Sequence, residues 1–424
     1  MKIAIIGSGI SGLTCAYYLK KEGYDPYIFE ANTYVGGHTH TVELQTESGL
    51  CPIDTGFIVF NEKTYPNFVG LLRELDVASQ MTDMSFSVFD PQSRFQYAGG
   101  SLNSLFAARK NLLSYKFYRL ISEIYRFQLA AKKLLARNEK NLILSEFIGQ
   151  HGFHTDLANL YLYPLISALW STPLNLVEQM PAYFVANFFY NHALLQMMPS
   201  LPWKVIQGGS HSYVKALTRH FENNIYLNTA IEWVKPKPGG GYYLSSKNEE
   251  IGHFEKVIIA THSDQALAML ACPDELTVEI LSQFTYQHNE VILHTDTSVL
   301  PSNPRAWASW NYLLVDQNVR HAVLNYYMNR LQNLSTKQHY CVSLNARDFI
   351  NPEKIIQIYH YAHPQYTLHS LAAQSRQKEL NCNGSLYFCG AYWGFGFHED
   401  GVKSALTVCK QILSEENHEP INAA

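Results

Sequence analysis

Three glycines near the N-terminus, Gly7, Gly9 and Gly12, have the spacing of a loop that binds the phosphates of a dinucleotide. The first would allow a tight turn, the second a close approach of the backbone to a pyrophosphate, and the third close packing of a helix on a strand. Glu30 follows at the distance at which an acidic residue binds ribose hydroxyls, and an acid disfavours the 2′-phosphate of NADP. These residue types therefore indicate binding of FAD or NAD.

The elements that must position these residues are recognisable in the sequence. The β-branched run 2–6 predicts a strand buried on both faces, residues 11–21 predict a helix, and residues 25–30 predict the next strand. This strand–helix–strand context distinguishes a nucleotide-binding loop from an ordinary glycine-rich turn. The free N–H groups at the start of the helix would contact the phosphates, which adds Ile10 and Ser11 to the expected site.

A second group of residues that could do chemistry lies near the C-terminus, in the sequence GAYWGFGFHEDGVKSA (390–405). Its His-Glu-Asp run could be an acid/base site, and its aromatic residues could pack in a core or line a cofactor pocket. Gly401 is expected to open a helix, with Asp400 as the N-cap. Because a helix start stabilises negative charge, the amides of Gly401 and Val402 could bind a negatively charged group.

The composition excludes several classes of protein. The 424 residues exceed the usual length of one domain, and 47% hydrophobic and 16% charged residues indicate a globular protein. A formal net charge of −4 gives no reason to expect a nucleic acid as partner. Seven scattered cysteines without CxxC spacing favour a reducing compartment. No cluster has metal-ligand spacing and no GxSxG elbow occurs, so we expect neither a metal nor a hydrolytic triad.

The segment 105–137 is the main indication of a possible surface partner. No signal peptide and no run of about 18 apolar residues is evident, so we expect a cytoplasmic protein. The segment carries eight basic residues against one acid, interleaved with Leu, Phe, Tyr and Ile. This pattern is more often a solvated helical face, but it is also typical of helices that lie on anionic membranes. Peripheral membrane contact through this segment therefore stays open, as does the oligomeric state.

Motifs at both ends of the chain resemble those of the flavin-containing amine oxidase and phytoene desaturase superfamily. They are IGSGISGLTCAYYL, FEANTYVGGHTHTV, DTGFIVFN and LYFCGAYWGFGFHEDGVKSA. More narrowly, the chain is similar to bacterial predicted NAD/FAD-binding oxidoreductases and to the N-terminal domain of plant cyclopropane fatty acid synthases. The resemblance implies an α/β fold, in which a Rossmann-like FAD-binding domain of the glutathione-reductase type is interleaved with an α+β substrate domain.

The resemblance also implies how the chain is divided and where the cofactor lies. We expect residues 1–65, 205–275 and 381–415 in the FAD-binding domain, residues 66–204 and 276–380 in the substrate domain, and a C-terminal tail at 416–424. FAD is expected to be non-covalent, since no cysteine stands at the usual attachment site. The further residues expected to bind it are Ala31, Gly37, His38, Thr39, Gly56, Phe57, Ile58, Val234, Ala260, His262, Gly390, Ala391, Glu399 and Asp400, and the resemblance implies that the amides of Gly401 and Val402 face the flavin ring.

The resemblance assigns the redox chemistry to the flavin and the orientation of the substrate to the protein. The dense aromatic residues, and Ala391 where many relatives have an acid, favour an apolar, fatty-acyl or phospholipid-acyl substrate over an amine. We therefore expect hydride removal in a desaturation or a double-bond rearrangement, with amine oxidation and a non-redox lipid-binding role as alternatives. His398, His192 and Tyr392 are the candidates for proton handling, which only geometry can test.

Overall fold

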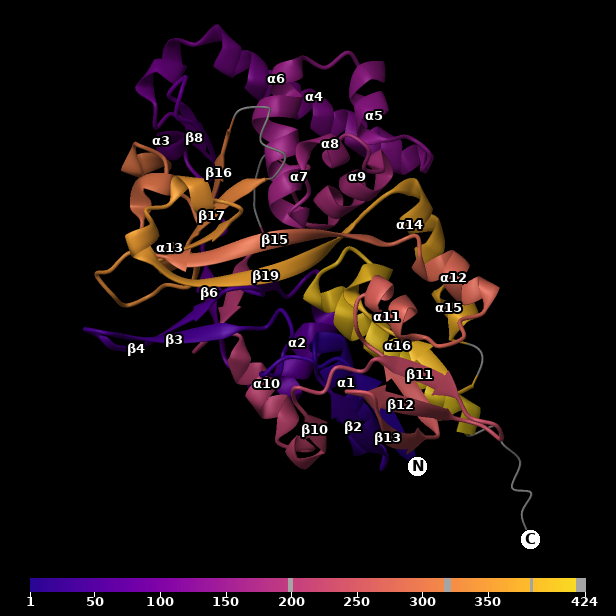
Figure 1. The fold of residues 1–424 in the computed structure, drawn as a ribbon. Coiled ribbons are helices and arrows are strands. Elements are labelled where there is room, and N and C mark those ends of the chain that lie inside the picture. The colour runs from indigo at the N-terminus through magenta and orange to yellow at the C-terminus, as the bar shows by residue number, and fades with distance from the viewer. Residues whose placement is uncertain (197–200, 316–321, 382–383, 417–424) are drawn as a thin grey trace.

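A parallel sheet built from distant parts of the chain lies at one end of the molecule. The computed structural model describes residues 1–196, 201–315, 322–381 and 384–416, and Figure 1 shows this sheet near the N-terminus. All neighbouring strands in it run parallel, and the predicted strands at 2–6 and 25–30 are confirmed. In spatial order the strands are β10 (Ile225–Tyr226), β2 (Asp25–Phe29), β1 (Lys2–Ile6), β14 (Lys256–Ile259) and β20 (Leu386–Phe388).

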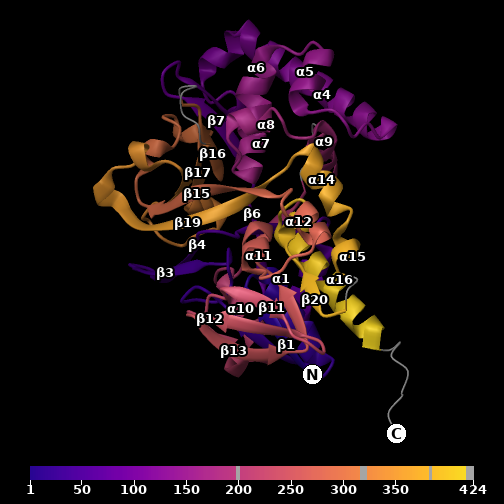
Figure 2. The same ribbon diagram turned by 45° about the vertical axis from the view of Figure 1, so that its right-hand side comes forward.

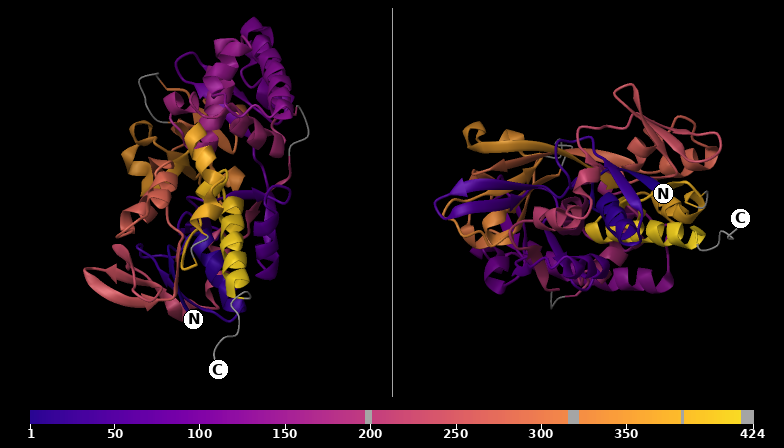
Figure 3. Two further views of the ribbon diagram at one scale, coloured as in Figure 1. Left: turned by 90° about the vertical axis from the view of Figure 1, so that its right-hand side faces the viewer. Right: turned by 90° about the horizontal axis from the view of Figure 1, so that it is seen from below.

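Both faces of this sheet are covered, which explains why β1 is apolar at almost every position. One face shares a core with the helices α1 (Ile10–Lys21), α2 (Pro66–Glu74), α10 (His211–Thr218) and α16 (His398–Glu416). Figure 3 shows α16, in yellow, beside the N-terminal part of the chain. The other face packs against an antiparallel sheet of β11 (Trp233–Pro236), β12 (Tyr242–Ser246) and β13 (Glu249–Phe254).

A seven-stranded sheet crosses the middle of the molecule, where Figure 1 shows its two long strands β15 and β19 side by side. Its strand pairs are antiparallel except for the parallel pair of β16 and β7. The order is β19 (Ile355–Gln365), β15 (Thr285–His294), β18 (Cys341–Leu344), β17 (Val323–Tyr327), β16 (Trp310–Leu313), β7 (Phe86–Asp90) and β8 (Phe95–Ala98).

Two small sheets and a short set of connecting elements complete the strand structure. The small sheets are β3 (Thr41–Thr46) with β4 (Gly49–Asp54), and β5 (Val59–Asn61) and β6 (Ser79–Thr82) on either side of β9 (Trp203–Ile206). Helices α11 (Ser263–Met269), α12 (Glu275–Leu281), α13 (Met328–Leu331), α14 (Leu368–Gln374) and α15 (Gln377–Leu380) connect the strands.

Helices gather at the end of the molecule opposite the parallel sheet, as Figures 1 and 2 show. They are α3 (Leu102–Leu105), α4 (Tyr115–Arg137), α5 (Leu144–Gln150), α6 (Thr155–Leu157), α7 (Tyr163–Trp170), α8 (Leu174–Val177) and α9 (Ala182–Asn191). The Ser114 side chain caps the start of α4 by accepting from the Phe117 N–H, and left-handed Asn138 ends this helix. Within the described ranges, no helix is long and apolar enough to cross a membrane.

The five parallel strands all lie within the three segments expected to form the FAD-binding domain. The exact division of the chain stays a prediction. Helix α2 begins at Pro66, where the predicted substrate domain starts, yet it buries Phe68, Leu71 and Leu72 in the core of the parallel sheet. Of the predicted tail at 416–424, residues 417–424 lie outside the described part of the chain.

Candidate functional site

The glycine loop between β1 and α1 leaves open space at its second glycine. Gly7 has a φ of +100°, and a Cβ there would come within 3.0 Å of the Ala260 carbonyl oxygen. A Cβ on Gly12 would overlap the Gly7 carbonyl oxygen, so this glycine allows α1 to pack closely on the loop. A Cβ on Gly9, by contrast, would meet no heavy atom within 4 Å. Two glycines thus serve the fold, and the third leaves room beside the start of α1 for a phosphate.

Glu30, at the end of β2, is held in place by both of its carboxylate oxygens. Oε2 accepts hydrogen bonds from the Ser8 N–H at 2.9 Å and the Ser8 hydroxyl at 2.6 Å. Oε1 accepts from the Asn32 N–H at 2.9 Å and from Asn32 Nδ2 at 2.8 Å. The carboxylate is therefore oriented before any ribose reaches it. Ser8 and Asn32 were missed by the sequence analysis, because the variable positions of the motif carry no signal for this contact.

The second glycine pair lies directly against the first loop. The Gly36 N–H donates to the Ser8 carbonyl at 3.1 Å, and a Cβ on Gly37 would lie 3.1 Å from the Gly9 Cα. The Phe57 N–H donates to the His38 carbonyl at 2.8 Å, and a Cβ on Gly56 would overlap that carbonyl oxygen. The structure therefore brings these predicted residues together next to the open space at Gly9.

Three histidines from distant parts of the chain surround this region. The ring centroid of His38 lies 5.3 Å from that of His363 on β19 and 6.1 Å from that of His262, which follows β14. Burial lowers the pKa of His38 and of His262 to about 4 and that of His363 to about 3, and repulsion between neighbouring imidazoles adds to the lowering. All three rings are therefore neutral at pH 7. The sequence analysis did not identify His363, because only the pairing of β19 with β15 brings this residue close to His38.

His38 has the feature expected of a residue that awaits a ligand. Its Nε2 atom is buried and has no hydrogen-bond partner among the described residues. A buried polar atom without a partner costs free energy, so natural proteins seldom keep one unless a bound group satisfies it. The unpartnered Nε2 atom therefore makes His38 a candidate for contact with a bound group.

The start of α16 differs from the prediction. The helix begins at His398, three residues before Gly401, and the Gly401 N–H donates to the Phe397 carbonyl at 3.2 Å. The expectation that this N–H faces the flavin is therefore wrong, and Val402 is fully buried in the core. Gly401 instead allows close contact with α1, because a Cβ there would lie 2.8 Å from Ile10 Cγ2 and 2.9 Å from Ser11 Oγ.

Asp400 is not the residue that precedes the helix but lies in its first turn. Its Oδ2 accepts the Phe397 N–H at 3.0 Å, and its Oδ1 lies where a Cβ on Gly394 would be. Burial raises the pKa of Asp400 to about 7, against the lowering effect of the hydrogen bonds from the backbone of Phe397 and Phe395. The carboxyl group thus fixes the loop 394–397 rather than reaching toward a cofactor.

Glu399 binds a helix start and not a cofactor. One carboxylate oxygen accepts from the Asn67 N–H at 3.2 Å and from Asn67 Nδ2 at 2.6 Å, and the other accepts from the Phe68 N–H at 3.0 Å. These are orphan donors of the first turn of α2, which a carboxylate satisfies well. The predicted cofactor contact of Glu399 is therefore replaced by a contact 332 residues away in the sequence.

The His398 ring is enclosed and bonded. It stacks on Phe57 with a centroid distance of 3.4 Å, and its Nε2 lies 3.0 Å from both the Thr39 hydroxyl and the Tyr213 hydroxyl. Burial lowers the pKa of His398 well below its usual value. This ring joins the start of α16 to the loop after Gly37 and to α10, which is a positioning role and not that of a substrate base.

The other two candidates for proton handling are also packed away from a common site. His192 Nδ1 lies 2.9 Å from the Phe188 carbonyl and its Nε2 lies 3.1 Å from the Thr64 hydroxyl, so both ring nitrogens are engaged. Tyr392 packs its ring 5.0 Å from that of Phe284 in the core beside the parallel sheet, although its buried hydroxyl, like that of Tyr366, has no hydrogen-bond partner among the described residues. The three predicted catalytic residues are therefore not brought together.

The remaining predicted cofactor residues fall into two groups. Ala260 and Gly390 follow β14 and β20, so with Gly7 they mark the carboxyl ends of three neighbouring parallel strands, where such sheets bind ligands. Of the others, Ala31 follows Glu30 at the end of β2 on the same edge, whereas Ile58, Val234 and Ala391 are engaged by the protein. Ala31 is exposed, and Ile58 lies in the core of the central sheet. The Val234 carbonyl accepts from the Ala271 N–H, and the Ala391 carbonyl accepts from the N–H groups of Gly394 and Gly396.

The aromatic residues of the C-terminal segment divide into two sets. Tyr392 and Trp393 pack on Phe284, whereas Phe395 and Phe397 meet the helical region. Phe395 lies 4.8 Å from Phe184, and Phe397 stacks on Phe188 at 5.1 Å. We call this second set the aromatic cluster, and its members are Trp170, Phe184, Phe188, Tyr366, Phe395 and Phe397.

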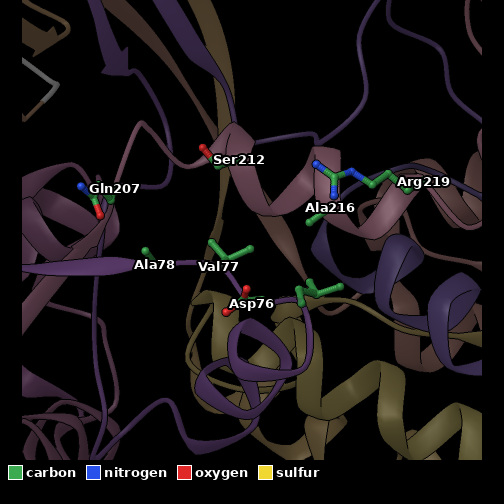
Figure 4. A pocket seen from close by; sticks show the side chains of 8 residues that line it. Asp76, Val77, Ala78, Gln207, Ser212, Ala216 and Arg219 are labelled. Atoms are coloured by element: carbon green, nitrogen blue, oxygen red, sulfur yellow. The ribbon is translucent and has the colours of Figure 1, made fainter.

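A separate hollow lies between α10 and the turn after α2, and Figure 4 shows the side chains around it. Its volume is about 290 Å³, and it is lined by Leu75, Asp76, Val77, Ala78, Gln207, Ser212, Ala216 and Arg219. None of these residues belongs to the glycine loops or to the carboxyl edge of the parallel sheet. The hollow therefore does not coincide with the candidate site.

The sequence matches the family described as flavin containing amine oxidoreductase over residues 10–339. A 1-hydroxycarotenoid 3,4-desaturase of Flavobacterium sp. (strain P99-3) is 43% identical over 74 residues, which are 18% of this chain and 14% of the desaturase. This chain therefore matches only a small part of that relative's length.

Two solved structures share the fold over nearly the whole chain. Cyclohexylamine oxidase from Brevibacterium oxydans IH-35A is 14% identical, with a TM-score of 0.67 over 98% of this chain and 99% of that one. The CLA-producing fatty acid isomerase from P. acnes is also 14% identical, with a TM-score of 0.66 over 97% and 98%. The α/β fold expected from the sequence is thereby confirmed. The chain belongs to the flavin-containing amine oxidoreductase family, and it is an FAD-dependent oxidoreductase.

Proposed function

We propose that this oxidoreductase removes a hydride from an apolar acyl chain, of a fatty acid or a phospholipid, and thereby introduces a double bond or, where the hydride returns to another carbon of the chain, moves one. The observation that carries the proposal is the aromatic cluster, which meets the start of α16 and has no charged member. Aromatic side chains give an acyl chain a large apolar contact area, and the cluster contains no carboxylate that would pair with an ammonium group. The resemblance to the N-terminal domain of plant cyclopropane fatty acid synthases supports the same substrate class.

The chain's own residues fit FAD at the carboxyl edge of the parallel sheet. The open space at Gly9 and the start of α1 would take the pyrophosphate, and the oriented Glu30 carboxylate would take the ribose hydroxyls. The unpartnered Nε2 of His38 would receive a hydrogen bond from the cofactor or donate one to it. Non-covalent attachment stays a prediction.

When bound, FAD supplies a two-electron acceptor for a hydride from a substrate C–H bond, and in a desaturation the neighbouring carbon also loses a proton. The aromatic cluster would hold the acyl chain and exclude water. Tyr366 brings into this cluster a hydroxyl without a hydrogen-bond partner in the described part of the chain. Burial raises the pKa of Tyr366 well above its usual value, so the hydroxyl stays protonated and could donate a hydrogen bond to the substrate.

Anaerobic bleaching of the flavin tests the proposal. We expect the visible flavin bands of the purified protein to bleach with unsaturated fatty acids or phospholipids and to persist with cyclohexylamine or putrescine. Bleaching by amines alone would assign amine oxidation instead. A protein that binds acyl chains, is not bleached by any of them and leaves the positions of their double bonds unchanged would support a non-redox lipid-binding role.

A pair of variants connects the assay to the aromatic cluster. Phe395→Ala removes one wall of the cluster and should weaken the acyl substrate's apparent affinity about tenfold, as expected for the loss of one buried aromatic contact. Phe349→Ala removes a phenylalanine that is exposed on a loop outside the cluster, and it should leave the affinity unchanged. Equal effects of the two substitutions would contradict the assignment.

A further inference from the structure

The segment from α3 to α4 carries an unusual amount of exposed apolar surface. Leu113 is 94% exposed, Tyr115 is 79% exposed and Leu102 is 76% exposed. Figures 1 and 2 show α4 at the end of the molecule away from the parallel sheet. We call this region the α4 surface, and its large exposed apolar residues are Leu102, Leu112, Leu113, Tyr115, Tyr118, Tyr125 and Leu129.

Helix α4 is apolar on two opposite sides. Its inner side buries Phe117, Phe127 and Leu134, of which Phe127 and Leu134 join the helical core. Its outer side exposes Tyr118, Tyr125 and Leu129, whose spacing of seven and then four residues places them on one face. A helix that only covered its own domain would need the inner stripe alone. Contiguous exposed apolar patches generally mark interaction sites.

The charge around this apolar surface is strongly positive. Between residues 105 and 137 the chain has eight basic side chains against one acid, although the whole protein has a formal net charge of −4. Half of these basic residues form ion pairs: Lys116 and Arg119 with Asp156, Arg126 with Glu123, and Arg137 with Glu139.

The other four basic residues have no acidic partner in the described part of the chain, although Arg109 and Lys110 donate to neutral oxygens of Phe106, Asn103 and Ser93. Among the described residues, no ion pair involves Arg109, Lys110, Lys132 or Lys133, which lie at the two ends of the apolar surface. Protein–protein interfaces are depleted in lysine, whereas anionic lipid surfaces attract it. Exposed tyrosines are also enriched where a protein meets the headgroup level of a bilayer.

We propose that the α4 surface docks the protein on an anionic lipid bilayer. Leu102 and Leu113 would enter the acyl boundary, the tyrosines would lie at headgroup level, and Lys132 and Lys133 would contact anionic headgroups. The inference goes beyond the proposed function, since bilayer binding requires no turnover. It would also bring an enzyme that acts on acyl chains to the place where such chains are most concentrated.

Vesicle co-sedimentation of the full-length, FAD-loaded protein tests the docking. We expect binding to phosphatidylcholine vesicles that contain phosphatidylglycerol, weak binding to pure phosphatidylcholine, and loss of the difference at high salt. Lys132→Gln combined with Lys133→Gln should weaken binding to the anionic vesicles by roughly 25-fold, at about fivefold for each basic residue. Leu113→Glu should weaken it at least as much.

Leu50→Glu is the matched control, because Leu50 is 61% exposed on the hairpin of β3 and β4, away from α4. It should bind vesicles like the unchanged protein, and all variants should keep their flavin spectrum, which shows that they are folded. Equal loss in Leu50→Glu and Leu113→Glu would overturn the assignment to the α4 surface. Failure of the unchanged protein to bind anionic vesicles would overturn the proposal, as would a stable dimer that Leu113→Glu dissociates without any vesicle binding.

Discussion

Gly9→Ala should separate cofactor binding from the stability of the fold. Gly9 has a φ of −68° and a ψ of 178°, a conformation that any residue adopts, and an added Cβ meets no heavy atom within 4 Å. The methyl group therefore causes no strain in the cofactor-free protein. Such a substitution stabilises a protein by about 0.4–1 kcal/mol, because it restricts the unfolded chain. We expect the cofactor-free variant to unfold at an equal or slightly higher urea concentration.

The same methyl group would occupy the space that the pyrophosphate needs. A steric displacement of the phosphate that weakens FAD binding at least tenfold corresponds to about 1.4 kcal/mol. At an FAD concentration 100 times its dissociation constant, the unchanged protein gains about 2.7 kcal/mol from the ligand, and the variant would gain about half as much. Flavin fluorescence titration and urea unfolding with and without FAD measure the two effects separately.

Gly12→Ala is the control, because its Cβ would overlap the Gly7 carbonyl oxygen within the protein itself. It should destabilise the cofactor-free protein by about 1–3 kcal/mol, as overpacking does. The reasoning fails if Gly9→Ala binds FAD as tightly as the unchanged protein, or if it destabilises the cofactor-free protein as much as Gly12→Ala does.

Three further predictions follow from the surroundings of the candidate site. Glu399→Ala should lower the free energy of unfolding by about 1 kcal/mol through loss of the α2 contact and leave FAD affinity unchanged in a flavin titration; weaker FAD binding would restore the role expected from the sequence. His192→Asn should lower the free energy of unfolding by about 1–3 kcal/mol and leave the pH dependence of anaerobic flavin bleaching unchanged; a shifted pH dependence would show that the ring acts as a base. Because the folded-state pKa values of His38, His262 and His363 lie below the ordinary 6.5, the unfolded chain binds more protons between pH 6.5 and about 4. The free energy of unfolding of the cofactor-free protein should thus be highest above pH 6.5 and fall toward pH 4, by up to about 3 kcal/mol for each histidine. A urea concentration at the unfolding midpoint that does not change over this range would contradict the burial of these rings in the neutral form.

The first nucleotide-binding unit could be predicted because its signals are local. The strand β1, the glycine loop, α1 and β2 are consecutive, and each glycine's role depends on neighbours within a few residues or on the adjacent β14. The sequence pattern therefore contains nearly all the geometry of this unit. The position of Glu30 follows as well, although its bonds to Ser8 and Asn32 do not.

The start of α16 could not be predicted for the opposite reason. An aspartate before a glycine looks like an N-cap, but the Asp400 side chain reaches back to the N–H of Phe397 and adds a turn to the helix. The partner of Glu399 is the first turn of α2, whose approach depends on the whole core of the parallel sheet. His363 likewise arrives through the order of strands in the central sheet. Contacts between distant segments decide these roles, and such contacts cannot be inferred from the local patterns of a single sequence.

The three residues of the His-Glu-Asp run together fix the start of α16, although each makes only one of the contacts that do so. His398 bonds to Thr39 in the loop that follows Gly37, Glu399 bonds to the start of α2, and Asp400 bonds to the loop that carries Phe397. Three neighbouring side chains thus attach one helix start to three separate elements. Since that helix start meets both the glycine loop, through Gly401, and the aromatic cluster, through Phe397, it fixes the cofactor side of the site relative to the substrate side. Under the proposed function, hydride transfer would depend on the distance between cofactor and substrate, so these three residues would act by holding that distance rather than as acid and base groups.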